Sequence, residues 1–290
     1  MSVPFNSECL ICHLGKALKT AESLGDEATA MEFARELMQT YISAPRTAGS
    51  PWFGPATADL LHKYYGLDID RFRQEKLDSN AFVLSRLEQI RGKVEAAPDP
   101  VLAGLQFAIL GNYIDFSALH GEVSFDTMEQ MLDSALEMEL DKECYVNLCQ
   151  DLSTGKRLLY ITDNAGEIGF DRVFAEAIKK KYPHLAITFC VRGGPANNDA
   201  TREDAAAVGI PFPVIDNGNR VPGTQLELLG EEAKQALESA DVIIAKGQGN
   251  VETMLGCGYN VYYAFLVKCI RFIRRFDKPK LTPMLIKERK

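Results

Sequence analysis

The sequence predicts an α/β protein in which a Rossmann-like α/β/α core with a mostly parallel sheet follows an N-terminal helical bundle. Up to residue 155, apolar side chains recur at helical spacing. From residue 156, short apolar runs alternate with helix-like segments, a pattern typical of parallel strands buried on both faces. The 290 residues suffice for one large domain or two that pack closely. We therefore expect a helical domain over residues 1–155 and an α/β domain over residues 156–290.

The first half contains well-marked helix boundaries. Ser7 can cap a first helix that Gly25 ends, and Asp26 can cap the second. Pro55 suits the first turn of a third helix, which ends at Gly66. Further helices are expected over residues 68–91, 99–111, 125–139 and 141–152.

The second half is predicted to form strands separated by helices. Apolar, β-branched or aromatic runs indicate strands at residues 157–162, 186–191, 212–215, 241–245 and 261–267. Helical periodicity lies between them, at residues 167–181, 201–208 and 230–240. Sheets of this kind bind ligands beyond the carboxyl ends of their strands, so functional residues are expected there.

Composition limits the classes of partner. A net charge of −8 argues against a nucleic-acid or membrane-surface binder, because both partners are anionic. No apolar run approaches the roughly 20 residues needed to cross a bilayer, and the first residues do not read as a signal peptide. Seven cysteines, an odd number, fit reduced thiols. We expect a cytoplasmic protein that acts on a small molecule, which a local cluster of charge can bind even when it is anionic.

Polar clusters follow three of the predicted strands. Asp163 and Asn164 follow the first strand, and Asn198 and Asp199 follow the second. A later strand runs into the Gly-rich segment 246–250. Because the carboxyl ends of parallel strands share one edge of the sheet, we expect the three clusters to meet.

The first two clusters carry ligands for a hard cation. The oxygens of Asp163, Asn164 and Asp199 form a partial octahedron suited to Mg²⁺, Mn²⁺ or a related ion. These loops contain no histidine, so a zinc site of nitrogen and sulfur ligands is disfavoured. The simpler alternative is that residues 163–164 and 198–199 cap the helices that follow them.

The third cluster resembles an anion-binding turn. Gly247 and Gly249 let backbone N–H groups approach a phosphate closely, and Lys246 supplies a positive charge. The segment is neither a Walker A sequence nor GxGxxG, and a simple turn is the alternative. We expect this loop, including Asn250, to bind substrate together with Asn198.

Together these motifs resemble the domain-of-unknown-function 89 family, whose members are described as metal-dependent damage-control phosphatases. The matching segments are residues 163–167, 198–201 with Asp204, 246–252, the GNxxD segment 111–115 and the CxxC segment 9–12. The resemblance implies an active site between a helical bundle and an α/β/α core. It also implies hydrolysis of phosphate monoesters, such as sugar phosphates or phosphopantetheine-like damaged metabolites.

The resemblance assigns roles to individual residues. It implies that the metal is bound by Asp163, Asn164 and Asp199, and the phosphate by Lys246. It also places three residues at the site: Asn112, Asp115 and Glu167. We favour direct attack by water because Asp163 is already a ligand, and the general base stays open among Asp199, Glu167 and Asp115. The metal stays open among Mg²⁺, Mn²⁺, Co²⁺ and Ni²⁺.

Three alternatives stay open at this point. Cys9, Cys12 and His13 share a helix face, so they are either buried side chains or a soft-metal site. The same segment fits the CxxCH pattern of haem attachment, which is disfavoured because it requires export. A methyltransferase using S-adenosylmethionine is a second possible function, although the loop after the first strand lacks the usual glycine-rich run. The third is a metabolite-binding module without catalysis.

Overall fold

A six-stranded sheet forms the centre of this computed structural model, which describes residues 3–115 and 124–288. The strand order is β3-β2-β1-β4-β5-β6. Strands β1 to β5 are parallel to their neighbours, whereas β6 pairs antiparallel with β5. The predicted α/β class with a mostly parallel sheet is therefore confirmed. The strands are β1 (Arg157–Ile161), β2 (Ala186–Val191), β3 (Val214–Asp216), β4 (Val242–Lys246), β5 (Val261–Leu266) and β6 (Pro283–Lys287).

The central strands form because their sequences are apolar throughout. Every residue of β4 and β5 is buried, as expected for strands covered on both faces. The sequence did not predict β6, which lies at the sheet edge with most of its residues half-buried. It begins with Pro283 and ends with Lys287, residue types that occur on edge strands.

Helices cover both faces of the sheet, and several begin at side-chain caps. Asn6, Asp26, Asp99, Ser124 and Asp141 each accept a hydrogen bond from a backbone N–H in the first turn of a helix. The helices are α1 (Ser7–Leu24), α2 (Glu27–Ser43), α3 (Gly54–Tyr65), α4 (Arg73–Leu84), α5 (Leu87–Ala96), α6 (Pro100–Gly111), α7 (Phe125–Ser134), α8 (Lys142–Thr154), α9 (Glu167–Lys181), α10 (Arg202–Ala207), α11 (Glu231–Ser239), α12 (Gly247–Met254) and α13 (Ile270–Phe276).

The helix boundaries correct three sequence predictions. Asn6, rather than Ser7, caps α1 by accepting a hydrogen bond from the N–H of Cys9 at 2.9 Å. The single helix expected over residues 68–91 is two helices, because the chain turns between α4 and α5 at Ser85 and Arg86. Helix α12 begins at Gly247, where we expected a loop.

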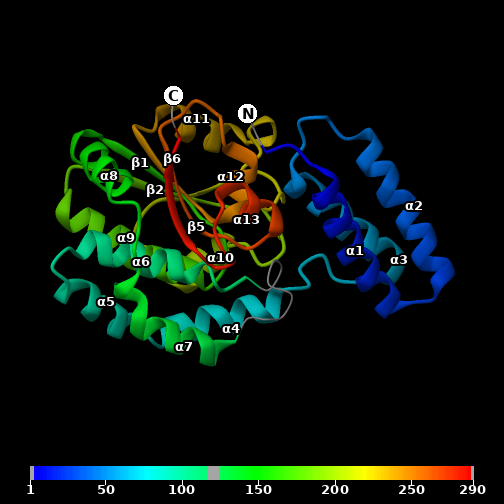
Figure 1. Ribbon diagram of the computed structural model, residues 1–290, viewed down its shortest axis with the longest axis horizontal. Helices are drawn as coiled ribbons and strands as arrows, with labels where there is room; N and C mark the ends of the chain where they lie inside the picture. The colour runs from blue at the N-terminus through cyan, green and yellow to red at the C-terminus, as the bar shows by residue number, and fades with distance from the viewer. Residues whose placement is uncertain (1–2, 116–123, 289–290) are drawn as a thin grey trace.

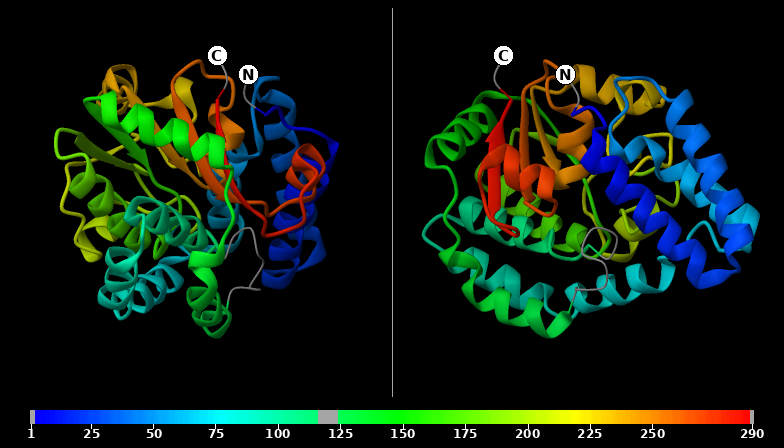
Figure 2. Two further views of the ribbon diagram at one scale, coloured as in Figure 1. Left: turned by 60° about the vertical axis from the view of Figure 1, so that its left-hand side comes forward. Right: turned by 45° about the vertical axis from the view of Figure 1, so that its right-hand side comes forward.

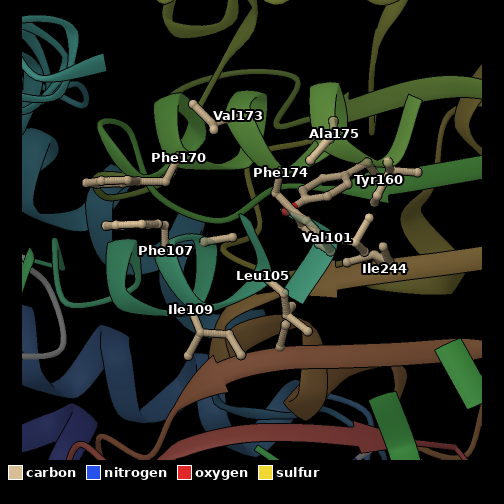
Figure 3. Close-up of a cluster of buried hydrophobic side chains, with 14 of the residues drawn as sticks. Val101, Leu105, Phe107, Ile109, Tyr160, Phe170, Val173, Phe174, Ala175 and Ile244 are labelled. Atoms are coloured by element: carbon tan, nitrogen blue, oxygen red, sulfur yellow. The ribbon is translucent and has the colours of Figure 1, made fainter. Parts of the chain in front are cut away.

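The larger core lies between α6, α9 and one face of the sheet. Alternate strand residues such as Tyr160 and Ile244 face this core and pack with Phe174 of α9. Figure 3 shows these side chains together with Phe107 of α6 and Phe170 of α9, which lie between the two helices. The other strand residues, such as Leu159 and Ile243, face α11, α12 and α13.

The first three helices form a separate core. Phe33, Leu37 and Leu61 pack between α1, α2 and α3, and this group lies to one side of the sheet (Figures 1 and 2). Helices α4 to α8 instead share the larger core with the sheet. The helices before β1 therefore pack as two groups rather than one bundle, and the expected division at residue 155 stays a prediction. No helix in the described ranges has both the length and the apolar character needed to cross a membrane.

We expect Phe174→Ala to lower the free energy of unfolding by about 3–5 kcal/mol, because it leaves a cavity in the larger core. Phe174 is fully buried and packs edge-on against Tyr160. Urea denaturation would measure the change, with Ile11→Ala as the control because Ile11 is 74% exposed. A change below about 1 kcal/mol for Phe174→Ala would contradict the packing described here.

Candidate active site

A cavity of about 460 Å³ lies between the α1–α3 group and the carboxyl ends of the strands. One wall is formed by α1 and α3, with side chains such as Lys16 and Leu61. The opposite wall carries polar residues that follow β1, β2 and β5: Asp163, Asn164, Asn198, Asp199 and Lys268. The cavity therefore opens at the sheet edge where doubly wound folds bind ligands.

The loops after β1 and β2 are hydrogen-bonded to each other. The N–H of Ala200 donates to the carbonyl oxygen of Asp163 at 2.7 Å, and the N–H of Ala165 donates to that of Asn198 at 2.9 Å. Asn164 and Asp199 form an isolated antiparallel bridge between these pairs. The two loops thus hold both predicted metal-ligand segments side by side.

Helix capping does not account for these polar residues. Helix α9 begins after Gly166 without a side-chain cap. Helix α10 is capped by Thr201 and Asp204 in a reciprocal capping box. The capping alternative for residues 163–164 and 198–199 is therefore wrong.

Hydrogen bonds from behind the cavity wall fix both carboxylates. The Oδ2 of Asp163 accepts from the Nδ2 atoms of Asn112 and Asn164, each at 2.9 Å. The Oδ2 of Asp199 accepts from Nε of Arg192 at 2.6 Å. Arg192 is fully buried, and its NH2 lies 3.9 Å from Oδ1 of Asp163. One guanidinium group therefore links the two carboxylates.

The sheet wall of the cavity brings the buried carboxylates of Asp163 and Asp199 close together. Burial, and then the carboxylates of Asp199 and Glu167, raise the pKa of Asp163 well above its usual range. Burial raises the pKa of Asp199 to about 6, although Arg192 opposes the shift. A positive charge on this wall would favour the ionised form of both side chains.

The donor set fits a hard divalent cation. The Nδ2 of Asn164 donates to Asp163 and Glu167, so this amide presents its Oδ1 on the opposite side, where Asn198 donates to it at 3.0 Å. The Oδ1 of Asn198 is buried and has no hydrogen-bond partner within the described ranges. Carboxylate and amide oxygens are the ligands that Mg²⁺ and Mn²⁺ prefer. Residues 3–115 and 124–288 contain no group of three His, Cys, Asp or Glu side chains arranged to hold a metal. A cation bound here would need the amide oxygen of Asn164 in addition to the two carboxylates.

Lys246 does not reach the cavity, which corrects the expectation that it binds phosphate. Its Nζ donates to the carbonyl oxygen of Ala108 at 2.8 Å, to Glu167 at 2.6 Å and to Asp171 at 2.7 Å. Burial lowers the pKa of Lys246, but the two carboxylates outweigh it, so the pKa lies above its usual range. With three acceptors the ammonium is saturated, and its role is structural.

Several other predicted site residues also lie behind the cavity wall. Glu167 is fully buried; besides Lys246, it accepts hydrogen bonds from Asn112 and from the backbone and side chain of Asn164. The buried Asn250 bonds Thr224 and backbone carbonyls. Asn112, Glu167 and Asn250 therefore position the wall without contacting the cavity.

The Gly-rich segment contributes in a different way from the one expected. Gly249 lines the cavity. At Gly247 a Cβ atom would lie 1.9 Å from Oδ2 of Asp163, and the backbone has a φ of +75°. Gly247 is thus needed for close approach to Asp163 rather than for a phosphate cradle.

Asp115 and Lys268 form the other charged pair on the wall. They lie 2.5 Å apart, and both line the cavity. Asp115 was predicted at the site, but Lys268 and Arg192 were not. The rule that polar residues follow strands could have found Lys268, which lies two positions after β5.

The CxxC segment faces the same cavity from α1. Cys9, Cys12 and His13 line it, and neither cysteine forms a disulfide within the described ranges. Burial, and then Lys16, lower the pKa of His13 to about 4, and its Nδ1 lies 2.7 Å from the hydroxyl of Tyr41. The thiol of Cys257 donates to Glu288 at 3.4 Å. Within the described ranges these side chains do not form a metal site.

The chain matches one family model along most of its length. The model of the damage-control phosphatase ARMT1-like domain covers residues 5–280. A damage-control phosphatase from Pyrococcus horikoshii is 32% identical over 284 residues, which are 94% of each chain. A damage-control phosphatase from Archaeoglobus fulgidus is 30% identical over 260 residues, or 85% of each chain.

A solved structure has the same fold. The crystal structure of a DUF89 family protein from Pyrococcus horikoshii superposes with a TM-score of 0.82 at 27% sequence identity. The match covers 99% of both chains. The helices of the first half and the α/β core are therefore both part of the shared fold.

We expect Lys246→Met to destabilise the protein by about 3–5 kcal/mol, because two carboxylates would remain buried without their cation. The free energy of unfolding in urea would measure the loss. Lys63→Met is the matched control, since it removes a lysine from an exposed ion pair with Glu36 and should change stability little. Equal stability of the two variants would contradict the structural role of Lys246.

Proposed function

Because this chain belongs to the damage-control phosphatase ARMT1-like domain family, we propose that it is a divalent-metal-dependent phosphatase. Its substrates are phosphate monoesters of small metabolites, such as sugar phosphates or phosphopantetheine-like damaged metabolites. The family model and the shared fold confirm the membership that the motifs indicated. One observation carries the proposal: Asp163, Asn164 and Asp199 converge on one wall of a cavity large enough for such a metabolite.

The metal ligands in this proposal are Asp163, Asn164 and Asp199. A bound Mg²⁺, Mn²⁺, Co²⁺ or Ni²⁺ would neutralise charge on the phosphate and lower the pKa of a coordinated water. The protein supplies the rigidity of the site, since Asn112 and Arg192 hold the two carboxylates from behind. Asn198 adds a further buried oxygen beside them.

Hydrolysis requires a base and a cation, and the Asp115–Lys268 pair provides both. A water oxygen bonds to phosphorus while the bond from phosphorus to the ester oxygen breaks. Asp115 takes the proton from the attacking water, and the departing alcohol oxygen takes up a proton from solvent. Asp115 then releases its proton to solvent, so the products are alcohol and inorganic phosphate. Lys268 replaces Lys246 as the lysine that contacts the phosphate, because its ammonium lies on the cavity wall. Both carboxylates are paired with a cation, and we favour Asp115 over Asp199 because Asp199 would be committed as a metal ligand.

The two alternative functions have no comparable support. The loop after β1 carries a carboxylate and an amide instead of a glycine-rich run for S-adenosylmethionine. A binding module without catalysis would not require a base beside a lysine on the same wall. Both alternatives are tested by the turnover experiment that follows.

We expect Asp163→Ala and Asp199→Ala each to lower the hydrolysis of p-nitrophenyl phosphate by more than about a hundredfold, because each removes a metal ligand. Rates would be measured with each of the four divalent ions, and folding of the variants by circular dichroism. Chelation should abolish wild-type activity, and added divalent ion should restore it. Activity that survives chelation or both substitutions would refute the metal-dependent mechanism.

Gly247→Ala should lower activity by about a hundredfold, because a Cβ at this position displaces the Asp163 carboxylate. Gly258→Ala is the matched control. Gly258 has a φ of +82° and no atom within 4 Å of a Cβ, so it carries a similar backbone cost without the clash. We expect both variants to lose stability, measured in urea, and only Gly247→Ala to lose activity. Full activity of Gly247→Ala would show that the Asp163 position is not critical.

A further inference from the structure

The two walls of the cavity differ in how their charges are paired. On the sheet wall, Lys268 contacts Asp115. Among the other cations that line the cavity, Arg220 pairs with Asp59, and Arg271 donates to the sulfur of Cys9. Two cavity-lining cations outside the sheet wall have no such partner: Arg71 before α4 and Lys16 on α1. Within residues 3–115 and 124–288, neither side chain makes a hydrogen bond or ion pair.

The Arg71 guanidinium is partly buried and has no hydrogen-bond acceptor among the residues that the structure describes. Its guanidinium carbon lies 5.0 Å from the centroid of the Phe72 ring. Burial lowers its pKa below the usual range, and Glu75, one turn further on, opposes this. Taking a guanidinium out of water without hydrogen bonds is unfavourable. A ligand anion would supply the missing acceptors, and planar guanidinium groups bind carboxylate and phosphate in a bidentate manner.

Lys16 lies on the face of α1 that lines the cavity. This face recurs every three or four residues, through Cys9, Cys12, His13, Lys16 and Thr20. Glu252, the acidic neighbour of Lys16, is buried and bonds Gln248, and burial raises its pKa despite the nearby Arg271 and Lys16. Lys16 therefore keeps its donors available to a ligand.

Apolar side chains also line this side of the cavity. Among them are Leu61, Ile69 and Phe72, which alternate with polar residues such as Ser50 and Thr57. A volume of about 460 Å³ holds a metabolite of several carbons in addition to a phosphoryl group. The cavity thus combines metal-ligating oxygens, a carbon-binding surface and unpaired cations.

We propose that Arg71 and Lys16 form a second anion-binding subsite, and that the preferred substrates are phosphate monoesters with a second anionic group on the carbon skeleton. The phosphoryl group that is hydrolysed binds at Asp163, Asn164 and Asp199. The second group, a carboxylate or a phosphate, binds at Arg71 and Lys16. This inference rests on the proposed phosphatase function and adds the class of substrate.

Three substrates with one carbon chain test the inference. Sorbitol 6-phosphate has a neutral hydroxymethyl group at the far end, 6-phosphogluconate has a carboxylate there, and sorbitol 1,6-bisphosphate has a phosphate. The full chain with a divalent ion should give a kcat/KM about tenfold or more higher for an anionic member than for the neutral one. The member that is preferred identifies the anion as carboxylate or phosphate.

Single substitutions assign the preference to residues. We expect Arg71→Met and Lys16→Met each to lower the ratio of anionic to neutral kcat/KM by about fivefold or more. The matched controls are Arg73→Met and Lys19→Met, which remove the same charges from exposed positions outside the cavity. These controls should leave the ratio unchanged, because long-range effects on an exposed charge are screened by salt.

A second measurement separates this inference from the proposed function. Calorimetric titration of the chain in EDTA would compare the affinities for 6-phosphogluconate, sorbitol 1,6-bisphosphate and sorbitol 6-phosphate. Absence of turnover, with tighter binding of an anionic member that Arg71→Met and Lys16→Met abolish, would refute the phosphatase and retain the subsite. Turnover of all three substrates with equal kcat/KM and equal affinity would overturn the subsite and retain the phosphatase. A preference that persists in both variants would also overturn it.

Discussion

The buried ion pair between Lys246 and Glu167 determines where the site can form. Both side chains are fully buried, and a buried charge is tolerated only when its partners are complete. Lys246 ends β4 and Glu167 begins α9, so the pair ties the sheet to the helix behind it. The second carboxylate oxygen of Glu167 accepts hydrogen bonds from the side-chain amides of Asn112 and Asn164. The same two amides also donate to Asp163. A chain of hydrogen bonds thus runs from the core to the cavity wall.

This arrangement separates charges that hold the fold from charges that face the cavity. Lys246 and Glu167 lie behind the wall, while Asp163 and Asp199 lie on it. Arg192 fixes the orientation of Asp199 by donating a hydrogen bond to its carboxylate, just as the amides of Asn112 and Asn164 fix Asp163. Oxygens held in this way need little reorganisation when they meet a cation, because their orientation is already fixed.

The sequence predicted the edge of the sheet but not the direction of each side chain. Apolar runs located five strands, and the strand-end rule brought Asp163, Asn164 and Asp199 to one cavity. The same rule failed for Lys246 because this residue still belongs to β4. Side chains alternate along a strand, so Lys246 shares the face of Val242 and Ile244, which pack toward α6 and α9. The alternation of side chains along β4, counted from Val242 and Ile244, would have placed Lys246 on the face toward α6 and α9.

Local sequence patterns could not predict residues whose role depends on contacts with distant parts of the chain. Arg192 follows β2 directly and looks like any polar residue of a loop; its importance comes from its distance to Asp199 and Asp163 after folding. Lys268 gains its role only from Asp115, which is 153 residues away in the chain. Pairings of this kind are set by tertiary packing, which a local sequence window does not contain.

The separate core of α1, α2 and α3 allows the cavity's helical wall to vary independently of its sheet wall. These helices pack around Phe33, Leu37 and Leu61 without contributing to the core of the sheet. Side chains that α1 directs into the cavity can therefore change without disturbing Asp163 or the ion pair behind it. The wall that carries Asp163 and Asp199 is constrained by buried charge, whereas the helical wall is constrained mainly by its own small core. In a fold built this way, the proposed reaction and the proposed choice of substrate depend on different parts of the chain.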